Sequence, residues 1–183
     1  MPPLETPELE MNFSAPFFNL PAIDGKNYTL EGLKGLKGLI VAFICNHCPY
    51  VQSIADKIAK EAIELKKIGI HLVGINSNDP IAYPEDSFDH MKIFAEKHHF
   101  TFPYLFDESQ EVAKAYGAVC TPDFFGFNSD LKLVYRGRLD AAGKNFLPDA
   151  KRELFLAMEK ISQDLPITDK QYPSLGCSIK WRI

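Results

Sequence analysis

Apolar positions along the chain follow two spacings, one typical of buried strands and one of amphipathic helices. Residues 39–44 form a continuous apolar run, which predicts a central strand that is covered on both faces. Residues 70–75 form a second run of the same kind. Between the two runs, Ile54, Ile58 and Leu65 recur at helical spacing. Because a whole helix separates the two strands, we predict that they run parallel to each other.

The rest of the pattern predicts smaller elements around this core. An early turn, Asp24-Gly25-Lys26, lies between short apolar stretches and predicts a hairpin that precedes the sheet. Residues 76–100 combine a polar loop with a helical pattern, and we interpret them as a helical insertion. A strand over 102–106, a hairpin over 124–135 and a helix over 148–162 follow. This order predicts an α/β fold with a central mixed sheet flanked by helices and an N-terminal β extension.

Length and charge limit the classes of partner. A chain of 183 residues with 46% hydrophobic residues suits one domain, which we expect over residues 1–183, with an N-terminal extension over 1–37 and a C-terminal tail over 164–183. The formal net charge of −4 comes without a basic stripe, which argues against nucleic acid and anionic membranes as partners. The sequence shows neither a signal-peptide pattern nor an apolar membrane span, so it predicts a cytoplasmic protein.

Two cysteines stand where the first core strand meets its helix. Cys45 and Cys48 enclose Asn46 and His47, and Pro49 suits the first turn of the helix. Thiol-disulfide exchange needs two sulfurs that can close a small ring, with one sulfur ionised and reachable, and a strand-to-helix junction favours both. We expect the helix start to stabilise a thiolate on Cys45, and the His47 imidazole to favour it further. The alternative is a pair of buried cysteines that pack as small apolar residues.

The order of elements around this motif resembles the thioredoxin fold, and Thr121-Pro122 stands where that fold has a cis-proline. Residues 43–51, 116–123 and 176–181 look like a peroxiredoxin-like branch of the thioredoxin superfamily, near the alkyl hydroperoxide reductase and thiol-specific antioxidant group. The resemblance implies a thioredoxin-like fold and an enzyme that reduces or exchanges disulfides through its CxxC pair. A peroxiredoxin-like thiol peroxidase with antioxidant activity is an alternative.

The expected mechanism uses no cofactor. Cys45 attacks a disulfide or sulfenate sulfur, and Cys48 then attacks the mixed disulfide. Thr121 and Pro122 support the site by lining a groove beside Cys45, where their backbone groups pair with an extended substrate strand. The partners are protein or small-molecule thiols and disulfides, or hydroperoxides in the peroxidase alternative.

The sequence departs from the peroxidase pattern. A peroxiredoxin holds its peroxide with a Pro, a Thr and an Arg, and alignment of its attacking cysteine with Cys48 places Val41 and Cys45 where the Pro and the Thr belong. The candidates for the peroxide-binding arginine are Arg136 and Arg138. We interpret them instead as solvated or ion-paired surface arginines.

Two further cysteines have open roles. Cys120 precedes Thr121 and is either an additional redox thiol or a buried core cysteine. Cys177 lies in the C-terminal tail and is either a mobile resolving thiol or part of a tail that packs on the sheet. A thioredoxin-fold metal-binding protein is a further alternative, because ligands for a soft metal such as copper are offered by Cys45, His47, Cys48 and Cys120. The sequence leaves a homodimer open.

Overall fold

The computed structural model describes residues 2–8, 10–145 and 147–183. Its strands, in chain order, are β1 (Leu4–Glu5), β2 (Asn19–Pro21), β3 (Asn27–Thr29), β4 (Gly38–Phe43), β5 (Ile70–Asn76), β6 (Tyr104–Phe106), β7 (Cys120–Thr121), β8 (Asp123–Asn128), β9 (Leu133–Gly137) and β10 (Leu175–Ser178). Its helices are α1 (Leu30–Leu33), α2 (Pro49–Gln52), α3 (Ala55–Lys67), α4 (Phe88–Lys97), α5 (Glu111–Tyr116) and α6 (Glu153–Ser162), with a 3₁₀ turn η1 (Pro84–Asp86). Within these residues, no helix is both long and apolar enough to cross a lipid bilayer.

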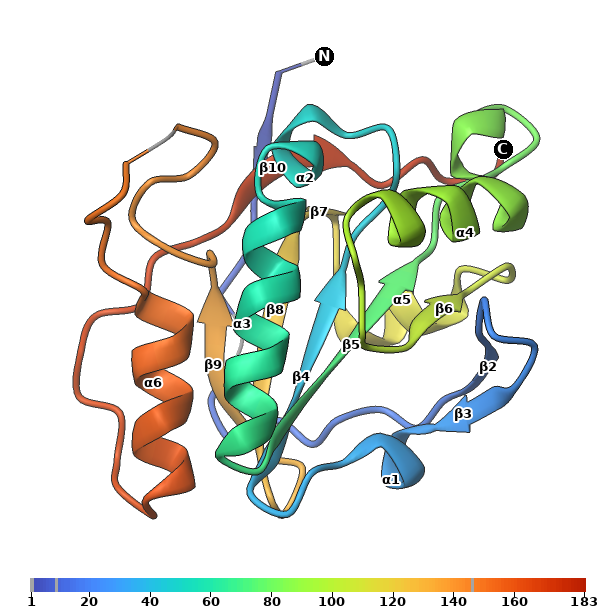
Figure 1. Cartoon of the computed structure of the whole chain (residues 1–183). Helices are drawn as coiled ribbons and strands as arrows, with labels where there is room; N and C mark the ends of the chain where they lie inside the picture. The colour runs from blue at the N-terminus through green and yellow to red at the C-terminus, as the bar shows by residue number, and fades with distance from the viewer. Residues whose placement is uncertain (1, 9, 146) are drawn as a thin grey trace.

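A five-stranded mixed sheet in the order β6-β5-β4-β8-β9 forms the centre of the molecule (Figure 1). The strand β5 runs parallel to β4 and β6, whereas β8 runs antiparallel to β4 and β9. Every residue of β4 is buried, because its side chains alternate between two faces that are both covered. The parallel pair and the late hairpin predicted from the apolar pattern are confirmed.

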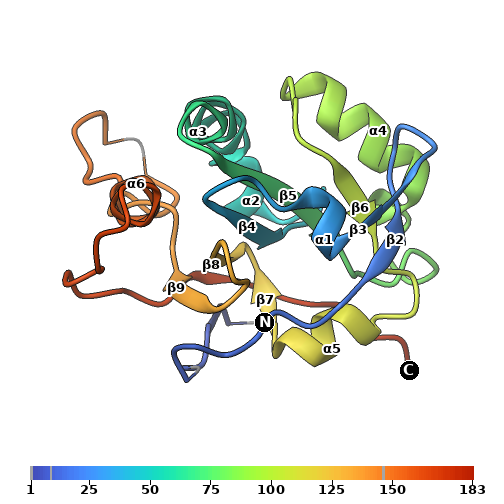
Figure 2. The same cartoon turned by 90° about the horizontal axis from the view of Figure 1, so that it is seen from below.

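Helices cover both faces of the sheet (Figure 2). On one face, α3, α4 and α6 enclose a core that includes Ile40, Ile58 and Leu154. On the other face, Val41 and Tyr116 belong to a second core, closed by α5 and the N-terminal segment. The hairpin β2–β3 and the helix α4 are the β extension and the helical insertion expected from the sequence. The predicted α/β class is therefore confirmed.

The helix that follows the two cysteines is broken. The sequence predicts one continuous helix, whereas the structure has the short α2, a break at Ser53 and Ile54, and then α3. The Ser53 hydroxyl donates to the carbonyl of Tyr50 at 2.9 Å, and such local bonds bend helices. Ile54 leaves helical geometry, with φ −117° and ψ 0°. The break lets α2 take a direction of its own, in contact with the tail strand β10.

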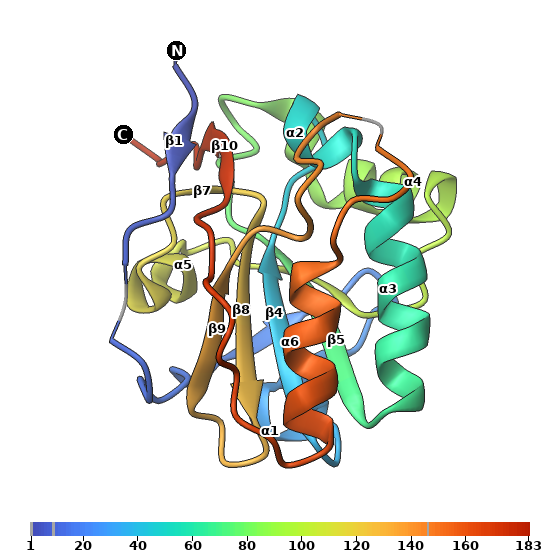
Figure 3. The same ribbon diagram turned by 90° about the vertical axis from the view of Figure 1, so that its left-hand side faces the viewer.

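The C-terminal tail forms a strand beside the central sheet. Its β10 pairs antiparallel with β7 on one side and with β1 on the other (Figure 3). Before the strand, the Ser174 hydroxyl donates to the carbonyl of Pro122 at 2.5 Å. After it, the Lys180 N–H donates to Asn78 Oδ1 at 2.8 Å. Hydrogen bonds therefore hold the tail at both ends of β10, and the sequence-based alternative of a tail packed on the fold is the arrangement observed.

Candidate active site

The two cysteines of the motif lie together just beyond the end of β4. Cys48 is the N-cap residue of α2, and Pro49 takes the first helical position, as predicted. The Cys45 sulfur lies 3.4 Å from the hydroxyl of Thr121, and Cys48, as a thiol, donates to the carbonyl of Thr121 at 3.3 Å. All four cysteines are free thiols in this structure. Both sulfurs of the motif thus lie against the same residue, Thr121.

The surroundings of the pair favour a thiolate on Cys48. Hydrogen bonding from the Cys45 thiol lowers the pKa of Cys48 against the effect of burial, and the Cys177 thiol and the N–H groups of Val51 and Cys177 lower it further. Burial raises the pKa of Cys45 well above its ordinary value, and its hydrogen bond with Cys48 and the nearby Asp86 charge act in the same direction. Both directions favour Cys48 over Cys45, the cysteine expected from the sequence to carry the thiolate.

The pair is also less reachable than the sequence indicates. Cys45 is 1% exposed and Cys48 is 0% exposed. The α2 helix and the tail strand β10 lie against each other at this end of the molecule (Figure 1). A partner in solution therefore meets other groups before it meets either sulfur.

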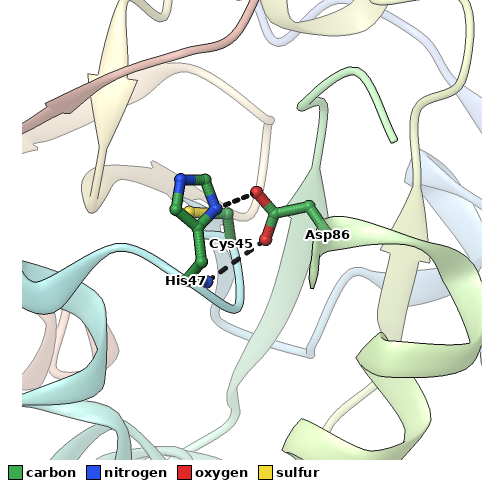
Figure 4. A group of neighbouring side chains, drawn as sticks. All are labelled: Cys45, His47 and Asp86. Carbon is green, nitrogen blue, oxygen red and sulfur yellow. Dashed lines mark hydrogen bonds and ion pairs between the residues drawn. The ribbon is translucent and has the colours of Figure 1, made fainter. Parts of the chain in front are cut away.

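A buried carboxylate, Asp86, holds the loop between the two cysteines (Figure 4). One of its oxygens accepts the backbone N–H groups of Asn46 at 2.7 Å and His47 at 3.2 Å. The other oxygen accepts the Asn78 side-chain amide at 2.8 Å and bonds Nδ1 of His47. Burial acts to raise the pKa of Asp86, but the bonds from His47 and Asn78 hold it below its usual value. Asp86 therefore stays ionised and fixes both the backbone and the imidazole.

His47 lies beside Cys45, and the Asp86 carboxylate stabilises its protonated form. The hydrogen bond to Asp86 raises the pKa of His47, against the opposing effect of burial. The ring stacks on Tyr83 with centroids 5.5 Å apart. Ligand-type atoms of Cys45, His47 and Asp86 all lie within 4.8 Å of one another. An imidazole in this position can exchange a proton with the Cys45 thiol.

Asp86 was not among the site residues predicted from the sequence. This residue lies in the loop before α4, and it is 40 positions from the Asn46 amide that it binds. The only signal was a loop rich in Asn and Asp beside the motif, and such loops are common without a catalytic role.

The peptide bond between Thr121 and Pro122 is cis, as the resemblance implies. The strand edge at Thr121 is not open, however. Cys177 of β10 is the direct antiparallel partner of Thr121. The expectation that Thr121 pairs with an extended substrate strand is therefore wrong for this structure, because the chain's own tail already fills that edge.

Cys120 is close enough to Cys48 and Cys177 to interact electrostatically with both, whereas the two arginines are bound in ion pairs. Cys120 is buried, and burial together with the Asp123 charge raises its pKa. Arg136 Nη2 pairs with the Asp123 carboxylate at 2.7 Å, and Arg138 Nε pairs with Glu153 at 2.7 Å. Both arginines are ion-paired, as predicted, but Arg136 is 6% exposed and so lies inside the protein.

A cavity of about 400 Å³ opens beside the cis-proline. Its wall includes Tyr50 of α2, Pro122 and Leu175 of β10, with the cationic side chains of Arg138 and Lys144. Several of these residues stand close to the cysteines in the chain, although no cysteine lines the cavity. The cavity therefore provides room for a small molecule near the redox pair.

Comparison with known proteins relates this site to a family. The pattern of the AhpC/TSA family matches residues 11–136. Peroxiredoxin Bcp of Escherichia coli (strain K12) is 28% identical over 130 residues, which are 71% of this chain and 78% of that protein. The thiol-disulfide oxidoreductase ResA of Bacillus thuringiensis subsp. konkukian (strain 97-27) is 26% identical over 135 residues, 69% of each chain.

Solved structures extend the comparison. An uncharacterized conserved protein from Geobacillus kaustophilus is 43% identical, with a TM-score of 0.95 over 100% of this chain and 97% of that one. The thioredoxin domain of a thiol-disulfide oxidoreductase from Bacteroides vulgatus is 18% identical, with a TM-score of 0.60 over 70% of this chain and 89% of that one, and shares the fold. The thioredoxin-like fold expected from the sequence is confirmed, and the chain belongs to the AhpC/TSA family.

Proposed function

We propose that this enzyme is a thiol-disulfide oxidoreductase whose redox pair is Cys45 and Cys48, with Cys48 as the attacking sulfur. The observation that supports it is the placement of both thiols against Thr121 beside the cis-proline, with surroundings that lower the pKa of Cys48. Membership of the AhpC/TSA family supports a thiol-based redox function, since the relatives are named as a peroxiredoxin and as a thiol-disulfide oxidoreductase.

The reaction has two exchange steps. The Cys48 thiolate attacks one sulfur of a partner disulfide, the partner's S–S bond breaks, and the other partner sulfur leaves as a thiolate. Cys45 then attacks the Cys48 sulfur, which releases the second partner thiol and leaves a Cys45–Cys48 disulfide. Two electrons pass from the dithiol to the partner. The reverse sequence oxidises a partner.

His47 and Asp86 serve the second step. The high pKa of Cys45 means that this thiol must lose a proton as it attacks, and neutral His47 is the adjacent group that can accept it. In the reverse direction, protonated His47 returns the proton to Cys45 as this sulfur leaves. Asp86 is a positioning residue, because it holds the ring and the loop without touching the partner.

A thiol peroxidase is the second candidate, supported by the similarity to peroxiredoxin Bcp. The chain has Val41 and Cys45 where the peroxidase pattern requires Pro and Thr, and the Arg136 guanidinium is bound to Asp123. We therefore rank disulfide exchange above peroxide reduction.

Metal binding is the third candidate. Cys45, His47 and Asp86 offer a sulfur, a nitrogen and an oxygen ligand within 4.8 Å of one another. The predicted ligand set contained Cys48 and Cys120, whereas the cluster found among the described residues contains Asp86. A metal ion here would bind the sulfur that the exchange reaction needs.

The first test is insulin reduction with dithiothreitol as the electron donor. We expect Cys48→Ser to fall to the uncatalysed rate. In the double variant Cys45→Ser/Cys177→Ser, reduced and then freed of dithiothreitol, insulin should remain on Cys48 as a mixed disulfide that can be isolated. The control, Cys120→Ala, removes a buried thiol that the mechanism does not use, and should keep wild-type turnover. Full turnover by Cys48→Ser would contradict the proposal.

Two parallel measurements separate the other candidates. Hydroperoxide consumption that exceeds insulin reduction and depends on Cys48 would favour the peroxidase. One equivalent of zinc or copper in protein purified without chelator, lost in Asp86→Asn, would favour metal binding.

A further inference from the structure

A third sulfur lies beside the redox pair. In the ladder between β10 and β7, Cys177 stands directly opposite Thr121, the residue whose carbonyl lies 3.3 Å from the Cys48 sulfur. The Cys177 side chain packs against the same apolar cluster that contains Cys45 and Cys48. Thr121 is therefore a common neighbour of Cys48 and Cys177.

The three sulfurs differ in their access to solvent. Cys45 and Cys48 are buried at 1% and 0% exposure, whereas Cys177 is partly exposed. A reagent in solution can thus reach the Cys177 sulfur before it reaches either member of the pair.

The fold holds Cys177 in this place. The tail is anchored before β10 by Ser174 and after it by Lys180, whose carbonyl also accepts the Gln110 side-chain amide at 2.9 Å. Within β10, a Cβ atom on Gly176 would lie 1.8 Å from the Thr121 carbonyl oxygen, so only glycine allows the strands to approach this closely. The placement of Cys177 beside Cys48 is therefore part of the folded structure, and the expectation of a mobile tail is replaced by a fixed one.

We propose that Cys177 is the exchange port of the enzyme, through which electrons from a low-molecular-weight thiol reach the buried Cys45–Cys48 pair by way of a Cys48–Cys177 disulfide. This inference rests on the proposed function and names its electron donor by chemical class. A compact thiol fits because β10 occupies the edge of β7, where an extended protein segment would have to pair.

The exchange starts from the Cys45–Cys48 disulfide. Cys177 gives up its proton to water and attacks the Cys48 sulfur; the bond to Cys45 breaks, and Cys45 leaves with the proton of His47. The external thiolate then attacks the Cys177 sulfur, and Cys48 leaves as a thiolate. A second external thiolate attacks the external sulfur and frees Cys177. Two external thiols become one disulfide, and the pair gains two electrons.

The test compares reduction of the oxidised full-length protein by glutathione. Wild type, Cys177→Ser and Cys177→Ala are oxidised with one equivalent of diamide, and the Cys45–Cys48 disulfide is verified by peptide mass spectrometry. Thiols are then trapped by acid quench and alkylation as glutathione reacts. We expect both variants to form the disulfide and to be reduced at least tenfold more slowly than wild type. In Cys45→Ser, diamide should instead link Cys48 to Cys177.

Each result decides the inference. Equal reduction rates for wild type and both Cys177 variants would overturn the exchange port and leave the proposed function intact. A diamide product of Cys45→Ser that links other cysteines would also overturn it. Failure of wild type to form a Cys45–Cys48 disulfide would overturn the proposed function and the port together. Circular dichroism melting of both variants separates lost reactivity from lost folding.

Discussion

The different behaviour of Cys45 and Cys48 comes from the groups around each sulfur, since the helix start was predicted correctly. The motif alone suggests that the first cysteine benefits from the helix start. In the structure, α2 begins at Pro49, so Cys48 is the residue at the cap, and the N–H of Val51 helps to lower the pKa of its thiol. Burial and the nearby Asp86 carboxylate raise the pKa of Cys45 and oppose its ionisation. The motif does not show these groups, and they decide which sulfur ionises more readily.

Asp86 should control the protonation of His47. We expect Asp86→Asn to lower the His47 pKa, because the amide removes the negative charge that raises it and leaves the opposing effect of burial. His47 should thus keep its proton to a higher pH in wild type than in the variant. Titration of the imidazole protons by NMR measures both values, and Asp89→Asn, an exposed carboxylate on α4, is the matched control.

Asp86→Asn should also change the stability of the fold by an amount that depends on pH. Because the folded-state pKa of His47 is raised, the bond to Asp86 stabilises the fold fully below the unfolded pKa and loses that contribution as pH rises through the folded pKa. The stability gap between wild type and Asp86→Asn should therefore narrow with rising pH over that interval. An unchanged His47 titration in Asp86→Asn would show that Asp86 does not control this ring.

Among the elements of the fold, β10 determines which partner molecules can reach the redox pair. The strand lies between β1 and β7 and places Cys177 beside Cys48. The sequence shows only a short tail with few apolar residues, and two-sided pairing of so short a strand is not visible in its own pattern. The pairing depends on β7 and β1, which are themselves only two residues long each.

Gly176 is the position where this arrangement is most sensitive. We expect Gly176→Ala to weaken the pairing of β10 with β7 by about 1–3 kcal/mol. The added Cβ would clash with the backbone carbonyl of Thr121, which cannot change rotamer as a side chain can. Hydrogen exchange of the tail peptide should speed up accordingly, and Cys48 should become easier to alkylate. Leu175→Ala, an exposed neighbour on the same strand, should change neither. Unaltered exchange in Gly176→Ala would contradict the tight approach of the strands.

At the scale of the whole molecule, a buried ion pair links the sheet to the segment that leads to the cis-proline. Arg136 of β9 pairs with Asp123 of β8 and also donates to the carbonyl of Gly117 at 3.1 Å. We expect Asp123→Ala to lower the free energy of unfolding by about 3–5 kcal/mol, because it leaves a buried guanidinium without its carboxylate. Urea denaturation measures this value.

The control is a surface pair of the same chemistry. Glu31 meets Lys34 at 3.4 Å with both side chains partly in water, so Glu31→Ala should cost at most about 0.5 kcal/mol. A single urea transition in both variants would also support our expectation of one domain over residues 1–183. Similar losses for the two variants would show that Arg136 is not buried as described.

Features that depend on short-range pattern could be predicted from the sequence. The apolar run before Cys45 makes β4, helical spacing makes α3, and the motif at their junction identifies thiol chemistry, because each of these needs only neighbouring residues. Three features needed the folded chain: the surroundings that favour a thiolate on Cys48, the bond from Asp86 to His47, and the pairing of the tail with β7. The groups involved are distant in the chain, as the 40 positions between Asp86 and Asn46 illustrate, and folding topology, not local pattern, sets which distant groups meet.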